Sequence, residues 1–299
     1  MKEIVKKIDI HVHTSESDWP TFPNPSGYPL PEELIAVYDK MGIEKGVLLP
    51  PCSNYSFETV SNYETYRIVE KYPDRFAWFC MFDPWQIRNS DSTDFVPALQ
   101  WCKEHGAKGV GELAANIPFD DPRALNLFRC CEEADMPVLF HVGLKGIEYG
   151  LIGGEHLEKL ETALKMFPKL KFFGHSTRFW WEISKYDIQD PEYKFCEGKV
   201  NPGGAVVELM RKYPNLMCDL SAGSGTSAMT RDPEFTYAFM EEFADRLFYG
   251  TDICRKTALQ DPPVRLSEFL DSAMLEGKIS YDTYYKICRG NAERLLGMK

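Results

Sequence analysis

Short apolar segments alternate with longer amphipathic ones along the 299-residue chain. Apolar segments of about four to eight residues, bounded by turn-forming residues, are typical of strands buried on both faces. Eight such segments are present, and we expect strands at Lys7–His13, Gly46–Pro50, Phe76–Phe82, Gly109–Leu113, Val138–Val142, Lys171–His175, Leu216–Leu220 and Leu247–Thr251.

Apolar residues at helical spacing lie between these segments. The clearest predicted helices are Pro31–Met41, Asp121–Ala134 and Glu155–Phe167. Pro122 stands at an early position of the second helix, where the missing proline N–H costs nothing. The chain is therefore a regular succession of strands and helices.

This succession predicts a parallel sheet, because parallel neighbours need a helical crossover between them. Eight strands in a chain of this length favour closure into a (β/α)₈ TIM barrel rather than an open sheet. The sequence contains neither Gly-x-Gly-x-x-Gly nor the Walker A pattern, which removes the commonest open-sheet nucleotide sites. We expect one TIM-barrel domain over residues 1–299.

Three predicted connections are longer than a simple turn, namely Ser15–Leu30, Phe82–Asp94 and Thr177–Gly203. Each follows the carboxyl end of a predicted strand, which is the end where a barrel carries its active site. We therefore expect these three loops to shape the pocket.

The composition restricts the classes of partner that the chain is expected to bind. The net charge of −11 argues against broad contact with a nucleic-acid backbone, which requires clustered lysine and arginine. No stretch is long and apolar enough for a membrane span, and the N-terminus lacks a separate apolar signal region. Nine scattered cysteines without a Cys-x-x-Cys pair indicate reduced, mostly buried thiols. We expect a cytoplasmic protein that binds a small molecule, with a homodimer as a possible assembly.

Four of the six histidines, namely His11, His13, His141 and His175, fall at the carboxyl ends of predicted strands. His11 and His13 are two residues apart on a strand, so both side chains point the same way. Two imidazoles in this arrangement can reach one ion at about 2.0–2.1 Å. A single inward histidine is more often a hydrogen-bonded core residue, but two buried imidazoles need partners.

Two carboxylates also end predicted strands. Asp252 ends the eighth strand, which closes the barrel beside the first, and Glu112 ends the fourth. An inward aspartate with no cation nearby in the sequence favours a metal ligand, whereas Glu112 is open to pairing with an arginine instead. His105 and His156 lie on predicted helices and are expected at the surface.

Together these motifs carry a family resemblance. His-Val-His on the first strand, His141, His175, Gly-Thr-Asp252 and the C-terminal Gly290-Asn291-Ala-Glu-Arg-Leu-Leu296 resemble the amidohydrolase superfamily, in particular its amidohydrolase-2 branch. The resemblance spans the whole chain. It implies that His11, His13, His141 and Asp252 hold a divalent ion, commonly zinc. His175 is then a further ligand or a catalytic group.

Glu112 departs from the pattern of the aromatic-acid decarboxylases in this branch, many of which have no acidic ligand on this strand. It is more similar to the bridging group of two-metal hydrolases, with one ion on His11, His13 and Asp252 and another on His141 and His175. Asp252 is also followed by Ile-Cys-Arg rather than the Tyr-Pro often seen in decarboxylating relatives.

The expected function is hydrolysis of a small-molecule amide, lactone or ester by a water that one or two divalent ions, zinc first, activate. Asp252 and His175 are the expected catalytic residues. The alternative is a mononuclear-zinc non-oxidative decarboxylase or hydratase of an aromatic or dicarboxylic acid. A non-catalytic metal-binding barrel and a nuclease are weaker hypotheses. The expected substrate contacts are Arg178, Trp180, Trp181 and Arg255.

Overall fold

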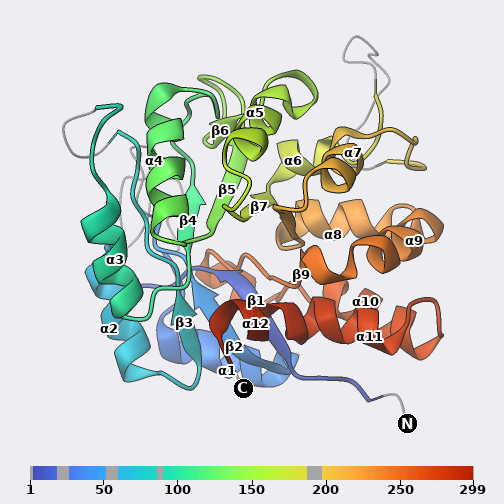
Figure 1. Ribbon diagram of the computed structural model, residues 1–299. Coiled ribbons are helices and arrows are strands. Elements are labelled where there is room, and N and C mark those ends of the chain that lie inside the picture. Colours follow the sequence, from blue (N-terminus) through green and yellow to red (C-terminus); the bar gives the residue numbers. More distant parts are fainter. Residues whose placement is uncertain (1–2, 19–26, 52–59, 86–89, 187–196, 299) are drawn as a thin grey trace.

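The computed structural model describes residues 3–18, 27–51, 60–85, 90–186 and 197–298. The strands in these ranges are β1 (Lys7–Val12), β2 (Ile43–Leu48), β3 (Phe76–Trp78), β4 (Val110–Leu113), β5 (Val138–Gly143), β6 (Leu151–Ile152), β7 (Phe172–His175), β8 (Leu216–Asp219) and β9 (Leu247–Phe248). The strands lie in the middle of the molecule and the helices surround them (Figure 1).

The α-helices are α1 (Pro31–Met41), α2 (Asn62–Lys71), α3 (Val96–Glu104), α4 (Pro122–Glu133), α5 (Glu158–Met166), α6 (Thr177–Trp181), α7 (Ala205–Lys212), α8 (Ala222–Thr230), α9 (Pro233–Phe243), α10 (Arg265–Leu275), α11 (Tyr281–Tyr285) and α12 (Asn291–Leu296). Short 3₁₀ turns lie at Glu155–Leu157, Ala244–Arg246 and Lys256–Leu259, and a π-helical turn at Lys286–Gly290 joins α11 to α12.

Parallel pairing orders the strands as β1-β2-β3 and β4-β5-β7-β8-β9. Backbone hydrogen bonds join these two sheets at both seams. Between β3 and β4, the Cys80 N–H donates to Gly109 O and the Gly111 N–H donates to Cys80 O. Between β9 and β1, the Ile10 N–H donates to Tyr249 O at 3.1 Å. The result is a ring of parallel strands, and the predicted (β/α)₈ TIM barrel is confirmed.

All eight predicted strands are present, although most are shorter than expected. The third ends at Trp78, because beyond it the chain pairs with β4 only through an isolated bridge at Cys80. Strand β6 was not predicted; it pairs with β5 outside the ring.

Pro31–Met41 is a helix as predicted. The second predicted helix begins at Pro122, and the Asp121 carboxylate caps it by accepting from the Arg123 N–H. The predicted continuous helix Glu155–Phe167 is wrong at its start. His156 and Leu157 have positive φ values of 50° and 62°, so a 3₁₀ turn precedes α5.

Of the three predicted loops, the part of Thr177–Gly203 that is described contains the short helix α6. Residues 19–26, 86–89 and 187–196 of these loops lie outside the described residues. Within the described ranges, no helix has the length and apolar character needed to cross a membrane. No disulfide links the cysteines in these ranges to one another, and all but Cys254 are buried.

Two apolar layers build the core. One cluster fills the interior of the ring, and a larger one lies between the strands and the outer helices. Side chains of β1, β2, β3, β5, β7, β8 and β9 form the inner cluster, and Ala292 and Leu296 of α12 pack onto it. Helix α12 therefore covers the amino-terminal end of the barrel and leaves the carboxyl ends of the strands for the site.

Asn291 fixes α12 in this position. Its side-chain amide donates to the carbonyl oxygens of Ala244 and Leu247, both at 2.7 Å, and the residue is buried. These bonds join the last helix to the start of β9, and they give a physical role to the asparagine of the C-terminal motif.

We predict that Asn291→Ala lowers the free energy of unfolding by about 2–4 kcal/mol, because two buried carbonyl groups lose their donor. Urea unfolding followed by circular dichroism measures this change. The matched control is Asn201→Ala at an exposed position, whose side chain makes one 3.3 Å bond. Equal stability of the two variants would contradict the role given to Asn291.

Candidate metal centre

Strand β1 supplies His11 and His13, which are buried and whose Nε2 atoms are 3.1 Å apart. Ile10 belongs to the inner cluster, but Val12 belongs to the outer one. Regular alternation would place both on the same side. The register against β2 shifts just before Val12, and this irregularity turns both histidines inward. Their side chains point the same way, as their spacing predicts.

Strand β4 brings Glu112 to the same place, and two glycines make this possible. A Cβ on Gly109 would lie 2.6 Å from the Phe79 ring. A Cβ on Gly111, where φ is +154°, would lie 2.6 Å from Leu139 O. A side chain at either position would collide with these groups, and the Glu112 side chain remains only 13% exposed.

The remaining predicted site residues come from later strands. His141 lies on β5 and His175 ends β7, and the two residues are paired in register. Asp252 follows β9 with a positive φ of 56°, and its N–H donates to His11 O at 2.8 Å. Aspartate tolerates this left-handed conformation better than most residues. The β9–β1 seam thus fixes the backbone of Asp252 directly against His11.

Glu112 and Asp252 each bring one oxygen close to the two β1 imidazoles. Glu112 Oε2 lies 3.6 Å from His11 Nε2 and 3.8 Å from His13 Nε2. Asp252 Oδ1 lies 3.5 Å and 3.4 Å from the same two nitrogens. Ligands about 2.0–2.1 Å from a tetrahedral ion are about 3.3 Å from one another. The separations among His11, His13 and Asp252 fit a divalent ion held by these three residues.

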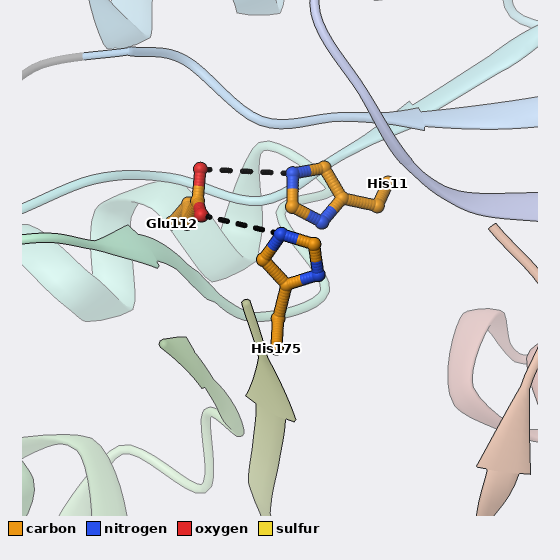
Figure 2. A group of neighbouring side chains, drawn as sticks. All are labelled: His11, Glu112 and His175. Atoms are coloured by element: carbon orange, nitrogen blue, oxygen red, sulfur yellow. Dashed lines mark ion pairs between the residues drawn. The ribbon is translucent and has the colours of Figure 1, made fainter. Parts of the chain in front are cut away.

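Glu112 also faces the other two histidines, and Asp252 faces one of them. Glu112 Oε1 lies 2.7 Å from His141 Nδ1 and 3.8 Å from His175 Nε2. Asp252 Oδ2 lies 3.8 Å from His175 Nε2. Figure 2 shows the Glu112 carboxylate directed at both His11 and His175. Each carboxylate therefore presents one oxygen to the β1 histidines and the other to His175.

Asp219, which the sequence analysis missed, orients two of the imidazoles. Its Oδ2 atom lies 2.6 Å from His11 Nδ1 and 3.2 Å from His175 Nδ1, and it is fully buried. A carboxylate only accepts, so each Nδ1–H donates and each Nε2 lone pair faces the site. Ser221 supports the arrangement by donating to Asp219 at 2.9 Å.

His13 is oriented in the same way, since its Nδ1 lies 2.8 Å from Leu49 O. A signal for Asp219 does exist in the sequence. In the predicted strand Leu216–Leu220, Met217 belongs to the inner cluster, so Asp219 two residues later also faces inward. An inward acid at a strand end, like Glu112 and Asp252, is a candidate for a group that binds a metal ion or orients its ligands.

Asp9 fastens the seam beneath the site. Its carboxylate accepts from the N–H groups of His11 and Thr251, from the Thr251 hydroxyl and from Tyr38 Oη. Burial raises the pKa of Asp9 to about 6 despite these four bonds. The Asp9 carboxylate thus fixes His11, a candidate ligand on β1, and Thr251, the residue before Asp252.

Charge is concentrated in the centre. Burial alone would lower the pKa of His11, but the charges of Asp252 and Asp219 outweigh it and raise the pKa well above its usual value. Burial would likewise raise the pKa of Glu112, yet hydrogen bonds with His11 and His141 hold it well below its usual value. The carboxylates are therefore ionised and suited to bind a cation.

The four expected substrate contacts have different surroundings. Arg178 is held by Glu148, with Nε 2.9 Å and Nη2 3.3 Å from its oxygens, and lies over the Trp181 ring at 4.6 Å. Its guanidinium thus already binds a carboxylate of the chain. Trp180 is 0% exposed within the outer core, and its expected substrate contact stays a prediction. Arg255 is exposed three residues after Asp252, and Arg255 and Trp181 stay predictions.

The remaining histidines lie outside this cluster, as expected. His105 Nδ1 lies 2.7 Å from Trp101 O, and His156 pairs with Glu182 at 3.1 Å with 46% of its side chain exposed. The histidines at strand ends are those that the structure brings together.

The family model described as amidohydrolase matches residues 8–298. The chain belongs to the amidohydrolase family. Its structural neighbours are TIM-barrel members of the amidohydrolase-2 group, and this chain is an enzyme of the amidohydrolase superfamily, which is metal-dependent. The resemblance seen in the sequence is therefore confirmed. A comparison with curated proteins gave no match.

Solved structures with the same fold differ in their reactions. An uncharacterized TIM-barrel protein from Bordetella bronchiseptica is 21% identical, with a TM-score of 0.68 over 98% of this chain and 99% of that one. A probable 2-pyrone-4,6-dicarboxylic acid hydrolase from Acinetobacter baumannii is 16% identical, with a TM-score of 0.61 over 98% and 100%. A dihydroxybenzoic acid decarboxylase from Polaromonas with bound manganese is 17% identical, with a TM-score of 0.58 over 98% and 97%.

We predict that Asp219→Asn weakens zinc binding about 10- to 100-fold, because the amide no longer fixes the Nδ1–H tautomer of two histidines by charge. Competition with a chromogenic chelator measures this affinity. Asp245→Asn, at a largely exposed carboxylate, is the matched control. Zinc affinity in Asp219→Asn equal to that of the control would refute the orienting role.

Proposed function

We propose that this enzyme is a metal-dependent hydrolase that uses a water activated by a divalent ion, with zinc as the first candidate, on a small-molecule amide, lactone or ester. The observation that carries the proposal is the position of Glu112. Its two oxygens face the two pairs of histidines, at 3.6 Å from His11 Nε2 and 2.7 Å from His141 Nδ1. A decarboxylation site with one ion has no evident use for a second inward carboxylate there.

The proposed ligands follow from the donor atoms. His11, His13 and Asp252 would hold a first ion, and their donor atoms lie within 4.8 Å of one another. His141 and His175 are the proposed ligands of a second ion, with Glu112 between the two groups. The distances fit one ion on the first group, and the proposal covers one or two ions.

The chemistry divides between the ion and the side chains. A divalent ion supplies Lewis acidity, which lowers the pKa of water towards about 7 and polarises a carbonyl group. Asp252 accepts the proton of the attacking water and passes it to the leaving group. Where His175 is not a ligand, its protonated form donates a hydrogen bond from Nε2 to the developing oxyanion, and the charge of Asp219 favours that form. Asp219 holds that imidazole in place.

A second candidate is a non-oxidative decarboxylase or hydratase of an aromatic or dicarboxylic acid with a single zinc ion. The group His11, His13 and Asp252 favours it, because these residues can hold an ion without Glu112. The fold that the chain shares with a dihydroxybenzoic acid decarboxylase adds support. The proposed hydrolase requires the Glu112 carboxylate, whereas the decarboxylase does not.

We predict that Glu112→Gln lowers kcat for lactone, ester or amide hydrolysis at least about 100-fold, because the neutral amide removes the charge between the two histidine groups. Zinc-loaded protein is assayed with a panel of γ-lactones, aryl esters and anilides by proton or amine release. Benzoic and dicarboxylic acids are tested in parallel for release of carbon dioxide. Glu276→Gln, at an exposed position on the C-cap of α10, is the matched control.

Release of carbon dioxide from an aromatic acid by both the wild type and Glu112→Gln would replace the hydrolase by the decarboxylase. Hydrolysis that persists undiminished in Glu112→Gln, with unchanged metal content, would eliminate the role given to this carboxylate.

A further inference from the structure

The segment Leu144–Gly150 leaves β5 just beyond His141 and folds back tightly onto that strand. A Cβ on Gly143 would lie 2.1 Å from Tyr149 O. A Cβ on Gly150, where φ is +122°, would lie 2.5 Å from Gly143 N. Only glycine at both positions permits this approach, so the sequence holds the segment directly against a strand of the metal centre.

Asn116, which follows β4, anchors the segment from one side. Its side-chain amide donates to the carbonyl oxygens of Leu144 and Glu148, at 3.2 Å and 2.5 Å. Its Oδ1 accepts from the Gly146 N–H at 3.0 Å. One side chain therefore binds the segment at three backbone positions.

The ion pair of Arg178 with Glu148 anchors the segment from the other side. The guanidinium approaches both carboxylate oxygens and lies over the Trp181 ring on α6. The structure thus gives Arg178 a positioning task, in place of the substrate contact expected from the sequence. With Asn116, it fixes the residues on both sides of Ile147.

These anchors place Tyr149 over the metal centre. Its ring centroid lies 4.2 Å from that of His141, at an interplanar angle of 37°, and the residue is 50% exposed. Burial, followed by the negative charges of Glu112 and Asp252, raises the pKa of the Tyr149 phenol. One part of the ring rests on His141, while the remainder is accessible.

Two aliphatic side chains of the segment are exposed as well. Ile147 is 79% exposed and Leu144 is 37% exposed, which are high values for aliphatic residues in a segment held by so many bonds. The fixed, half-exposed aromatic face of Tyr149 suits a flat, unsaturated group, because offset stacking adds to the burial of apolar area.

We propose that Tyr149 is a specificity-determining residue that stacks on a planar, unsaturated group attached to the reacting carbonyl or carboxyl group. Asn116 and the Arg178–Glu148 pair act as positioning residues for it. The inference rests on the proposed function only in placing the reaction at the metal centre beside His141. Tyr149 thereby selects conjugated or aromatic substrates over saturated ones of the same size.

The test compares benzoate with cyclohexanecarboxylate as probes, with zinc-loaded protein and isothermal titration calorimetry. We expect the wild type to bind benzoate more tightly, and Tyr149→Leu to lose about 2- to 12-fold of this preference. Tyr149→Phe keeps the ring and should retain it. Tyr281→Leu, at an exposed tyrosine on α11, is the matched control and should also retain the preference.

Asn116→Ala tests the positioning role. It should reduce the preference for benzoate as Tyr149→Leu does, while zinc content stays at the wild-type level. A preference that survives in Tyr149→Leu, or a wild type that binds both probes equally or neither, would overturn the inference. Failure of the proposed function is distinguishable, since it appears as a lack of zinc-dependent hydrolysis whatever the ratio of the two probes.

Discussion

The carboxylate of Asp9 joins the first strand of the barrel to the last, and the metal centre depends on this junction. It binds the N–H groups of His11 and Thr251 and two hydroxyl groups, all within a fully buried environment. The hydrogen bonds that close the ring therefore also place His11 and Asp252. They involve His11 itself and Thr251, which precedes Asp252.

The metal centre gathers negative charge from carboxylates that the imidazoles of the chain neutralise only in part. Glu112, Asp219 and Asp252 lie among four imidazoles, and taking ionised carboxylates out of water is costly unless a cation compensates. Protonated histidines provide part of this compensation, and a divalent ion provides it more completely.

The sequence predicted what depends on local pattern. The apolar runs located every strand of the ring, and the strand-end histidines come together in the candidate site. Spacing predicted that His11 and His13 point the same way, but their inward direction depends on the register shift of β1, which the sequence pattern does not show. The broken start of the helix Glu155–Phe167 was missed, since positive φ values at His156 and Leu157 have no apolar signature. The pairing of Arg178 with Glu148 was also missed, because the two residues are 30 positions apart and meet only in the folded chain.

The central claim is that the histidine pair on β1 holds a divalent ion. Elemental analysis of protein purified without chelator, beside His11→Ala and with His156→Ala as the surface control, tests it most directly. We expect one or two ions per chain in the wild type and in His156→Ala, and a marked loss in His11→Ala. A wild type without metal, or metal content unchanged by His11→Ala, would contradict it.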